Sequence, residues 1–168
     1  MKLNIGCGPI ILAGFVNLDI IKDFEIPFPS TSYPNTTFVD GWDVRKDLKD
    51  YKTDSIEAIT ISHVLYNIEE KDYSHIFSEL YRVLIPGGVL RITEDNHDQT
   101  PELLEKYNLN RDAVLTRITR FMTFYYLVEA GFMVHDVSDK TTFYKDFSLI
   151  QKIHGDSSQC FWIEGIKV

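Results

Sequence analysis

The sequence has few cysteines, no long apolar run and no dense basic stretch, and each shortage excludes a class of protein. Its 168 residues include two cysteines, Cys7 and Cys160, which belong to no CxxC or cysteine–histidine ligand spacing. We therefore expect no disulfide framework and no metal site. No apolar run approaches the ~20 residues that a membrane span needs, and no signal peptide is visible after Met1. These features predict a cytoplasmic protein without a membrane partner.

The charge balance argues against a nucleic-acid partner. The chain carries 17 Lys and Arg against 25 Asp and Glu, a formal net charge of −8. Proteins bind phosphate-rich polymers through Lys and Arg patches, and the densest basic stretch here holds only Arg111, Arg117 and Arg120. The length predicts one domain over residues 1–168, large enough to bury a core without disulfides or metal. The oligomeric state stays open.

Seven short segments have strand character, being rich in β-branched and aromatic residues and bounded by turn residues. They are Lys2–Ile5, Phe15–Ile20, Thr37–Val39, Ile56–Ile61, Val89–Thr93, Phe132–Val137 and Cys160–Val168. Helical segments lie between several of them, and this alternation predicts a mostly parallel sheet with helices on its faces. In such sheets, ligands bind at the carboxyl ends of the strands, where the strand order reverses.

Three helices are expected. An apolar stripe from Tyr73 to Leu84 predicts the clearest one, with Asn67 and Glu70 as a capping box at its start and Pro86-Gly87-Gly88 after its end. A second helix is expected to begin at Thr100-Pro101. A third runs through Phe121, Phe124, Tyr125 and Val128 and ends at Gly131, and its aromatic cluster is expected to form mostly core; the cluster is Phe121, Phe124, Tyr125 and Tyr126.

A Gly-x-Gly turn, Gly6-Cys7-Gly8, follows the first strand. Glycine lets a ligand approach the backbone closely, although a tight turn alone explains this pattern equally well. A dinucleotide fingerprint would continue to a third glycine, but position 11 is Ile, and the acid that ends the second strand, Asp19, comes early. These departures argue against NAD or FAD, and they leave room for only a shortened helix between the first two strands.

In their order and spacing, the motifs resemble class I S-adenosylmethionine (SAM)-dependent methyltransferases, especially the compact, type 11-like branch. The resemblance covers most of the chain. The matching segments are Gly6-Cys7-Gly8, Asp19, Gly41–Val44, Asp54–Ile59, Glu79–Ile92, Glu129–Phe132 and Phe161–Lys167. The resemblance implies SAM as cofactor. It also implies a three-layer, Rossmann-like α/β fold with a mostly parallel seven-stranded sheet, an antiparallel last strand and a shortened first helix.

The resemblance assigns the cofactor contacts residue by residue. Gly6, Cys7 and Gly8 would enclose the methionine part of SAM through their backbone, with Cys7 as a small lining residue and not a nucleophile. Asp19 would bind the ribose hydroxyls, and Ile20 would pack on the adenine. A solvated acid at the end of a strand is the alternative role for Asp19.

Asp43 and Val44 would lie at the end of the site that binds adenine. Asp43 would accept a hydrogen bond from the adenine amino group, with the Val44 backbone beside it. A turn or N-cap role within Asp43–Asp47 is a serious alternative. Trp42 could border the site, but a core position is favoured.

The methyl end of the site would follow the fourth strand, at Ser62 and His63. The resembling family carries His-Val-Leu-Glu-His there, whereas this chain has His63-Val64-Leu65-Tyr66-Asn67. Tyr66-Asn67 thus replaces the Glu-His pair, and any acid–base role of the family's second histidine is absent. By position His63 is the candidate general base, and a lining or structural role is equally compatible with the sequence. Tyr66 could contact the acceptor or pack, and Tyr126 could face an acceptor cleft.

The expected reaction is methyl transfer from SAM to an oxygen or nitrogen of a small-molecule or glycan acceptor. Such a transfer depends on alignment, which can supply ~7–11 kcal/mol, more than on covalent catalysis. Residues 95–100 and 139–158 would bind the acceptor, whose identity the fold does not determine. The altered residues Tyr66 and Asn67 keep one alternative open, a SAM-binding module with little or no transferase activity.

Overall fold

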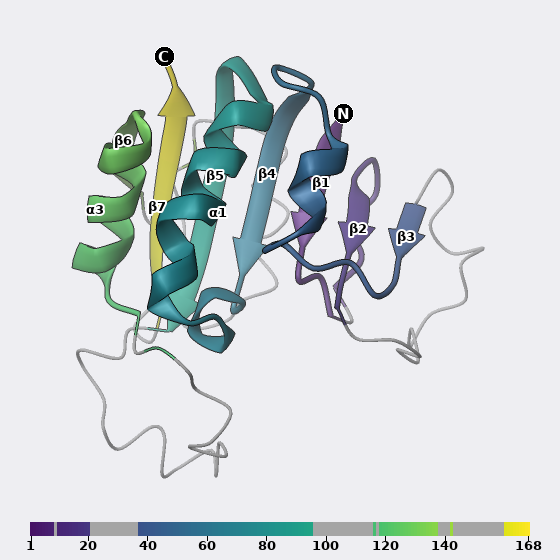
Figure 1. Ribbon diagram of the computed structural model, residues 1–168, viewed down its shortest axis with the longest axis horizontal. Coiled ribbons are helices and arrows are strands. Elements are labelled where there is room, and N and C mark those ends of the chain that lie inside the picture. Colours follow the sequence, from purple (N-terminus) through teal and green to yellow (C-terminus); the bar gives the residue numbers. More distant parts are fainter. Residues whose placement is uncertain (9, 21–36, 96–115, 117, 138–141, 143–159) are drawn as a thin grey trace, which may run out of the picture.

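One seven-stranded sheet organises the protein, with the strand order β3-β2-β1-β4-β5-β7-β6 (Figure 1). The computed structural model describes residues 1–8, 10–20, 37–95, 116, 118–137, 142 and 160–168. The strands are β1 Lys2–Ile5, β2 Val16–Leu18, β3 Thr37–Val39, β4 Ile56–Ser62, β5 Leu84–Asp95, β6 Phe132–Val137 and β7 Cys160–Lys167. All seven predicted strands are present. The second is shorter than predicted, and the fifth is longer at both ends.

The pairing confirms a mostly parallel sheet with an antiparallel last strand. β1 pairs in parallel with β2 and β4, and β4 pairs in parallel with β5. β7 runs antiparallel between β5 and β6. After β1 the chain continues outward through β2 and β3 and then returns to β4 on the other side of β1. The strand order therefore reverses between β1 and β4, which is where sheets of this kind open a ligand crevice.

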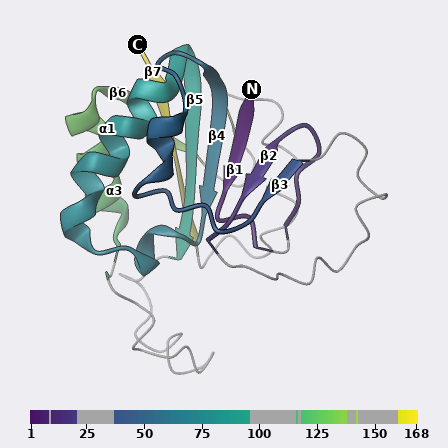
Figure 2. The same cartoon turned by 45° about the vertical axis from the view of Figure 1, so that its right-hand side comes forward.

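Two α-helices, α1 (Tyr73–Val83) and α3 (Arg120–Ala130), lie side by side over the same face of the sheet (Figures 1 and 2). The predicted capping box is wrong, because Asn67 lies in a separate 3-10 turn, η3 (Leu65–Asn67). α1 begins only after another such turn, η4 (Glu70–Asp72), and Asp72 makes no side-chain cap hydrogen bond. α3 is capped by Thr119, whose hydroxyl accepts from the Met122 amide at 3.1 Å.

The link between β1 and β2 contains turns and no helix among its described residues. Two buried amides hold it in place. Asn4 donates to the Asn17 side-chain oxygen and to the Ile10 carbonyl, both at 2.8 Å. Asn17 donates in turn to the Leu12 carbonyl at 3.2 Å. These side chains satisfy backbone groups that a helix would pair internally, which explains how so short a link stays ordered.

The core lies between the sheet and the two helices. Alternate residues of the central strands face α1, whose inward side is fully buried at Tyr73, Ile76, Phe77, Leu80 and Val83. The opposite side of β5 and β7 buries an ion pair, Arg91 to Glu164, at 2.6 Å. No helix in the described part of the chain is long and apolar enough to span a membrane.

The prediction for α3 is wrong in its orientation. Of the four aromatic residues expected in the core, Phe121, Phe124 and Tyr125 are solvent-exposed, and only Tyr126 packs against the core. Thr123 and Leu127 are the buried residues of this helix. Three parts of the sequence analysis fall wholly or almost wholly outside the described residues. They are the helix predicted from Thr100-Pro101, the basic residues Arg111 and Arg117, and the segment 139–158 expected to bind the acceptor.

Candidate cofactor and active site

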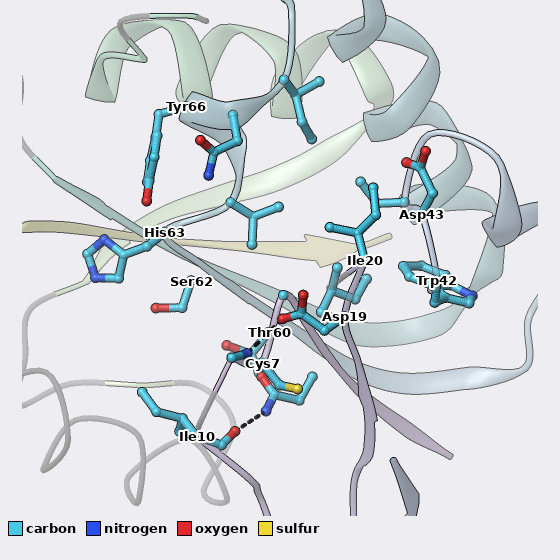
Figure 3. A pocket seen from close by; sticks show the side chains of 18 of the residues that line it. Cys7, Ile10, Asp19, Ile20, Trp42, Asp43, Thr60, Ser62, His63 and Tyr66 are labelled. Atoms are coloured by element: carbon cyan, nitrogen blue, oxygen red, sulfur yellow. Dashed lines mark hydrogen bonds between the residues drawn. The ribbon is translucent and has the colours of Figure 1, made fainter. Parts of the chain in front are cut away.

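A cavity of about 420 Å³ opens at the carboxyl ends of β1, β2 and β4, within the size range of small-molecule sites. Every predicted site residue except Tyr126 lines it: Gly6, Cys7, Gly8, Asp19, Ile20, Asp43, Val44, Ser62, His63 and Tyr66. In Figure 3, Ile20, Trp42 and Asp43 lie toward one side, and Ser62, His63 and Tyr66 lie toward the other, with Asp19 between the two groups. The cavity therefore has two chemically different ends.

The first position of the glycine turn after β1, Gly6, has no room for a side chain. Gly6 adopts a φ of 65°, and a Cβ at this position would overlap Cγ2 of Val64. The amides of Gly6 and Cys7 both donate to the Leu18 carbonyl, at 2.8 and 3.1 Å, so the turn is tied to β2. Such a turn lets a ligand approach the backbone closely.

Asp19 joins the glycine turn to the end of β2. Its side chain is almost fully buried, and its Oδ2 accepts from the Gly8 amide at 2.8 Å. Beside it, Ile20 is 54% exposed although it lines the cavity. A buried carboxylate next to an uncovered aliphatic side chain offers both a hydrogen-bond acceptor for hydroxyls and a surface for a flat apolar ring.

The thiol of Cys7 is a poor nucleophile at neutral pH. Burial and the neighbouring Asp19 carboxylate raise its pKa to about 12. A thiol with such a pKa stays protonated at neutral pH, and the thiolate is the nucleophilic form. This supports the predicted lining role.

The Asp43 carboxylate already accepts hydrogen bonds from a residue of its own turn. Its carboxylate accepts from the Arg45 side chain, at 2.9 Å from Nε and 2.7 Å from Nη2, and from the Arg45 amide at 3.0 Å. Hydrogen bonding to Arg45 lowers the pKa of Asp43 to about 2. The turn role considered as an alternative is thus present, and an adenine amino group would have to share the carboxylate with Arg45. Trp42 is buried in the core, as favoured, and also borders the cavity.

His63 sits in a small polar cluster. Its Nδ1 lies 3.6 Å from Oδ2 of Asp95, and the Cys160 thiol donates to Asp95 at 3.6 Å. Burial disfavours the charged imidazole, but hydrogen bonding to Asp95 and Cys160 and the charges of Asp95 and Glu94 outweigh it and raise the pKa of His63 to about 10. An imidazole protonated at neutral pH donates hydrogen bonds and does not act as a general base.

The same three side chains offer one nitrogen, one oxygen and one sulfur atom within 4.8 Å of one another. They could thus hold a metal ion, but they already contact each other as a hydrogen-bonded group. The sequence could not reveal this cluster, because its members lie at the ends of three different strands.

The sequence analysis missed two further residues near the His63 end of the cavity. Glu94 is fully buried and accepts from the amides of Val64 and Leu65, at 2.9 and 2.8 Å, and burial raises its pKa to about 7. It holds the backbone that follows His63. The Thr60 hydroxyl is buried at the cavity without a hydrogen-bond partner in the described part of the chain. A polar residue inside an otherwise apolar strand is the signal that could have identified either one.

The two tyrosines predicted to meet the acceptor differ in position. Tyr66 lines the cavity close to His63 (Figure 3). Tyr126 packs against α1 instead: its ring lies 5.8 Å from that of Phe77, and its hydroxyl donates to Glu70 at 3.1 Å. The structure thus does not bring Tyr126 to the described lining of the cavity.

Comparison with known structures shows the same architecture. The chain is similar to a SAM-dependent methyltransferase from Archaeoglobus fulgidus, with 17% identity, a TM-score of 0.71, and coverage of 99% of this chain and 85% of that one. A SAM-dependent methyltransferase from Mesorhizobium loti gives 15% identity, a TM-score of 0.66, and coverage of 98% and 89%. Phosphoethanolamine N-methyltransferase 2 from Haemonchus contortus, solved with SAM, gives 16% identity, a TM-score of 0.65, and coverage of 99% and 48%.

A search of curated proteins finds no match. Residues 30–152, more than half of the chain, match the model of the ubiE/COQ5 methyltransferase family. The match begins after Gly6-Cys7-Gly8 and Asp19, so the roles of those residues depend on the cavity geometry. The sheet topology and the family match together make this chain a SAM-dependent methyltransferase, and it belongs to the ubiE/COQ5 methyltransferase family.

Proposed function

We propose that this chain, as a single domain over residues 1–168, methylates an oxygen or nitrogen atom of a small-molecule or glycan acceptor. The observation that carries the proposal is the order of groups along the cavity. Ile20 and Asp43 lie toward one end, Asp19 in the middle, and Ser62 and His63 toward the other (Figure 3). An apolar surface, then a carboxylate, then a polar end matches adenine, ribose and the reacting methyl group.

The residues of the glycine turn fit SAM because Gly6, Cys7 and Gly8 all line the cavity, and the two glycines have positive φ and no Cβ, so a ligand can approach the backbone closely. When bound, SAM would supply the methyl group of its sulfonium, with the neutral thioether S-adenosylhomocysteine as the leaving group. In this proposal, Asp19 holds the ribose hydroxyls, Ile20 packs against the adenine, and Val44 flanks it. Gly6, Cys7 and Gly8 line the methionine part. Rigid placement of the two reactants is the main source of rate, ~7–11 kcal/mol.

His63 is assigned a different role from the one expected from its position. Because its pKa is raised to about 10, it enters the reaction as a hydrogen-bond donor with positive charge. Such a group orients an acceptor through an oxygen lone pair or an anionic substituent, beside Ser62 and Tyr66. The acceptor atom then has to be nucleophilic without help from His63, as a neutral amine or an acidic hydroxyl is.

Calorimetry with S-adenosylhomocysteine tests the cofactor part. We expect binding to the wild type and a loss of about 10- to 100-fold in affinity for Asp19→Ala, because a hydrogen bond to a charged group contributes ~1.5–3 kcal/mol. Asp50→Ala, which removes an exposed carboxylate outside the cavity, is the matched control and should bind as the wild type does. Equal affinity of all three proteins would contradict the proposed role of Asp19.

The acceptor part needs a transfer assay. Methyl-labelled SAM is incubated with separate panels of amines, phenols, sugars and carbon acids, and the labelled product is identified by mass spectrometry. A similar structure is described as a carbon methyltransferase, so carbon acceptors belong in the panel. Label on nitrogen or oxygen supports the proposal, and label on carbon alone overturns its acceptor class while leaving the cofactor site intact.

A further inference from the structure

The wall of the cavity contains a buried threonine, Thr60 of β4. It is only 1% exposed, and its hydroxyl makes no hydrogen bond within the described part of the chain. A buried hydroxyl without a partner costs free energy, and a valine would fill the same space without that cost. Because nearly all buried polar groups are hydrogen-bonded, an unpaired hydroxyl in the wall of a ligand site points to a partner on the ligand.

The sheet register places Thr60 near the methionine part of the proposed cofactor. Its partner on β1 is Asn4, two residues before Gly6, and Ser62 comes two residues after it on β4. Alternate residues of a strand point to the same face, so Thr60 and Ser62 share one face of the sheet. In Figure 3, Thr60 lies beyond Asp19, away from the residues at the adenine end. Thr60 is therefore close to both the glycine turn and the end of β4.

The amides of the glycine turn are already used. The methionine part of SAM ends in a carboxylate, which needs hydrogen-bond donors, and an ammonium group, which needs acceptors. The amides of Gly6 and Cys7 both donate to the Leu18 carbonyl. The Gly8 amide donates to the Asp19 carboxylate at 2.8 Å. Carbonyl oxygens of the turn have a second lone pair for the ammonium group, but its three N–H groups are committed, so the carboxylate needs another donor.

Asn4, the polar neighbour of Thr60 on β1, is committed as well. Its side-chain amide has two protons. One is donated to the Asn17 side chain and the other to the Ile10 carbonyl, both at 2.8 Å. The Thr60 hydroxyl is therefore the donor that this part of the described cavity wall leaves for a ligand.

Arg91, the neighbour of Thr60 on β5, favours an anion in this place. It is fully buried, and its Nη1 donates to Glu164 at 2.6 Å. Its Nε and Nη2 have no hydrogen-bond partner among the described residues. Although Arg91 does not line the cavity itself, neighbouring strands lie only ~4.8 Å apart, so its charge acts on a group held at Thr60. A surface of donors suits a carboxylate better than an ammonium group.

We propose that the Thr60 hydroxyl donates a hydrogen bond to the carboxylate of the methionine part of SAM. This inference rests on the proposed function, because it takes SAM as the ligand of the cavity. It adds a contact by which the protein distinguishes the whole cofactor from adenosine thioethers without an amino-acid end, such as methylthioadenosine. Thr60 is thus a specificity-determining residue and takes no part in the chemical step.

Calorimetry with S-adenosylhomocysteine and methylthioadenosine tests the contact. Thr60→Val keeps the shape of the side chain and removes the hydroxyl. It should bind S-adenosylhomocysteine about 10- to 100-fold more weakly than the wild type does, because a hydrogen bond to a charged group is lost. Its affinity for methylthioadenosine, which has no carboxylate, should stay at the wild-type value. Thr60→Ser keeps the hydroxyl and should bind both ligands nearly as the wild type does.

Thr93→Val is the matched control. The Thr93 hydroxyl is likewise buried and unpaired within the described residues, but Thr93 does not line the cavity. This variant should bind both ligands with wild-type affinity. Melting curves of the ligand-free proteins check for a structural role, and neither valine variant should melt below the wild type, since each removes a buried hydroxyl without a partner.

The outcomes separate this inference from the proposed function. Wild-type affinity of Thr60→Val for S-adenosylhomocysteine, an equal loss for both ligands, or a lower melting temperature would overturn the role of Thr60 and leave the cofactor assignment intact. Decarboxylated S-adenosylhomocysteine should bind equally to the wild type and to Thr60→Val, and a persistent difference would exclude the carboxylate as the partner. A wild type that does not bind S-adenosylhomocysteine at all would refute the proposed function, and this inference with it.

Discussion

The cavity and the outer stripe of α3, formed by Phe121, Phe124, Tyr125 and Val128, both expose apolar side chains, but they differ in shape and in the polar groups around them. In the cavity, Ile20 is 54% exposed and lies in a concave site beside Asp19 and the glycine turn. On α3, Phe121 is 77% exposed on a convex helix surface bounded by opposite charges. A concave site with a few placed polar groups suits a small molecule, whereas a convex helix surface offers no enclosure for one. Exposure alone therefore does not identify a partner; the shape and the neighbouring charges do.

The largest expected effect separates the two sides of α3. Leu127→Ala removes a buried side chain and should lower the free energy of unfolding by ~2–5 kcal/mol. Val128→Ala, one residue along but on the exposed side of the helix, should change it by less than ~0.5 kcal/mol. Urea denaturation monitored by circular dichroism measures both. Equal losses for the two variants would mean that the stripe is covered within the monomer.

Gly6→Ala should damage the cavity and leave the stripe intact. The new Cβ would overlap Val64, so the affinity for S-adenosylhomocysteine should fall by about 100-fold or more, equivalent to ~2.7 kcal/mol. Gly14→Ala is a matched control: Gly14 also has positive φ, at 78°, but the nearest atom to its Cβ would be Lys2 Nζ at 3.7 Å. Calorimetry measures both affinities. Unchanged affinity for Gly6→Ala would remove the glycine turn from the cofactor site.

The charge at the His63 end of the cavity should change with pH between about 6 and 10. The folded-state pKa of His63 is raised, so its stabilising contribution is complete below the unfolded value of about 6.5 and disappears as the pH rises through about 10. NMR titration should show His63 protonated at pH 8, and Asp95→Asn should lower its pKa by at least about 1 unit. A His63 pKa near 6.5 in the wild type would restore it as a candidate base.

The smallest expected effect concerns Tyr126, which belongs to neither region. Tyr126→Phe removes a solvent-exposed hydrogen bond to Glu70 and should change the free energy of unfolding by less than ~1 kcal/mol. Its ring contacts with Tyr73 and Phe77 remain, so cofactor affinity and methyl transfer should be unchanged. Steady-state kinetics on an identified acceptor provide the check. A loss of turnover at normal stability would place Tyr126 at the acceptor after all.

Sequence patterns were sufficient for most of the strands and for the cavity lining. Thr37–Val39 and Phe132–Val137 have the predicted bounds, because apolar runs between turn residues depend on nearby sequence alone. Gly6, Asp19 and Ser62 were found because they follow buried strands, and the ends of parallel strands converge at one edge of the sheet. The roles of these residues remain predictions.

The sequence by itself determined where this chain is extended, where it turns and which strand ends meet at the cofactor cavity. Only the tertiary structure decided which side of α3 faces the core and that Arg45 forms hydrogen bonds to the Asp43 carboxylate. It also decided that Asp95 and Cys160 lie beside His63. The physical reason is that periodicity reports an apolar stripe without saying what covers it. Likewise, a side chain's charge state depends on neighbours brought close by folding, not by sequence.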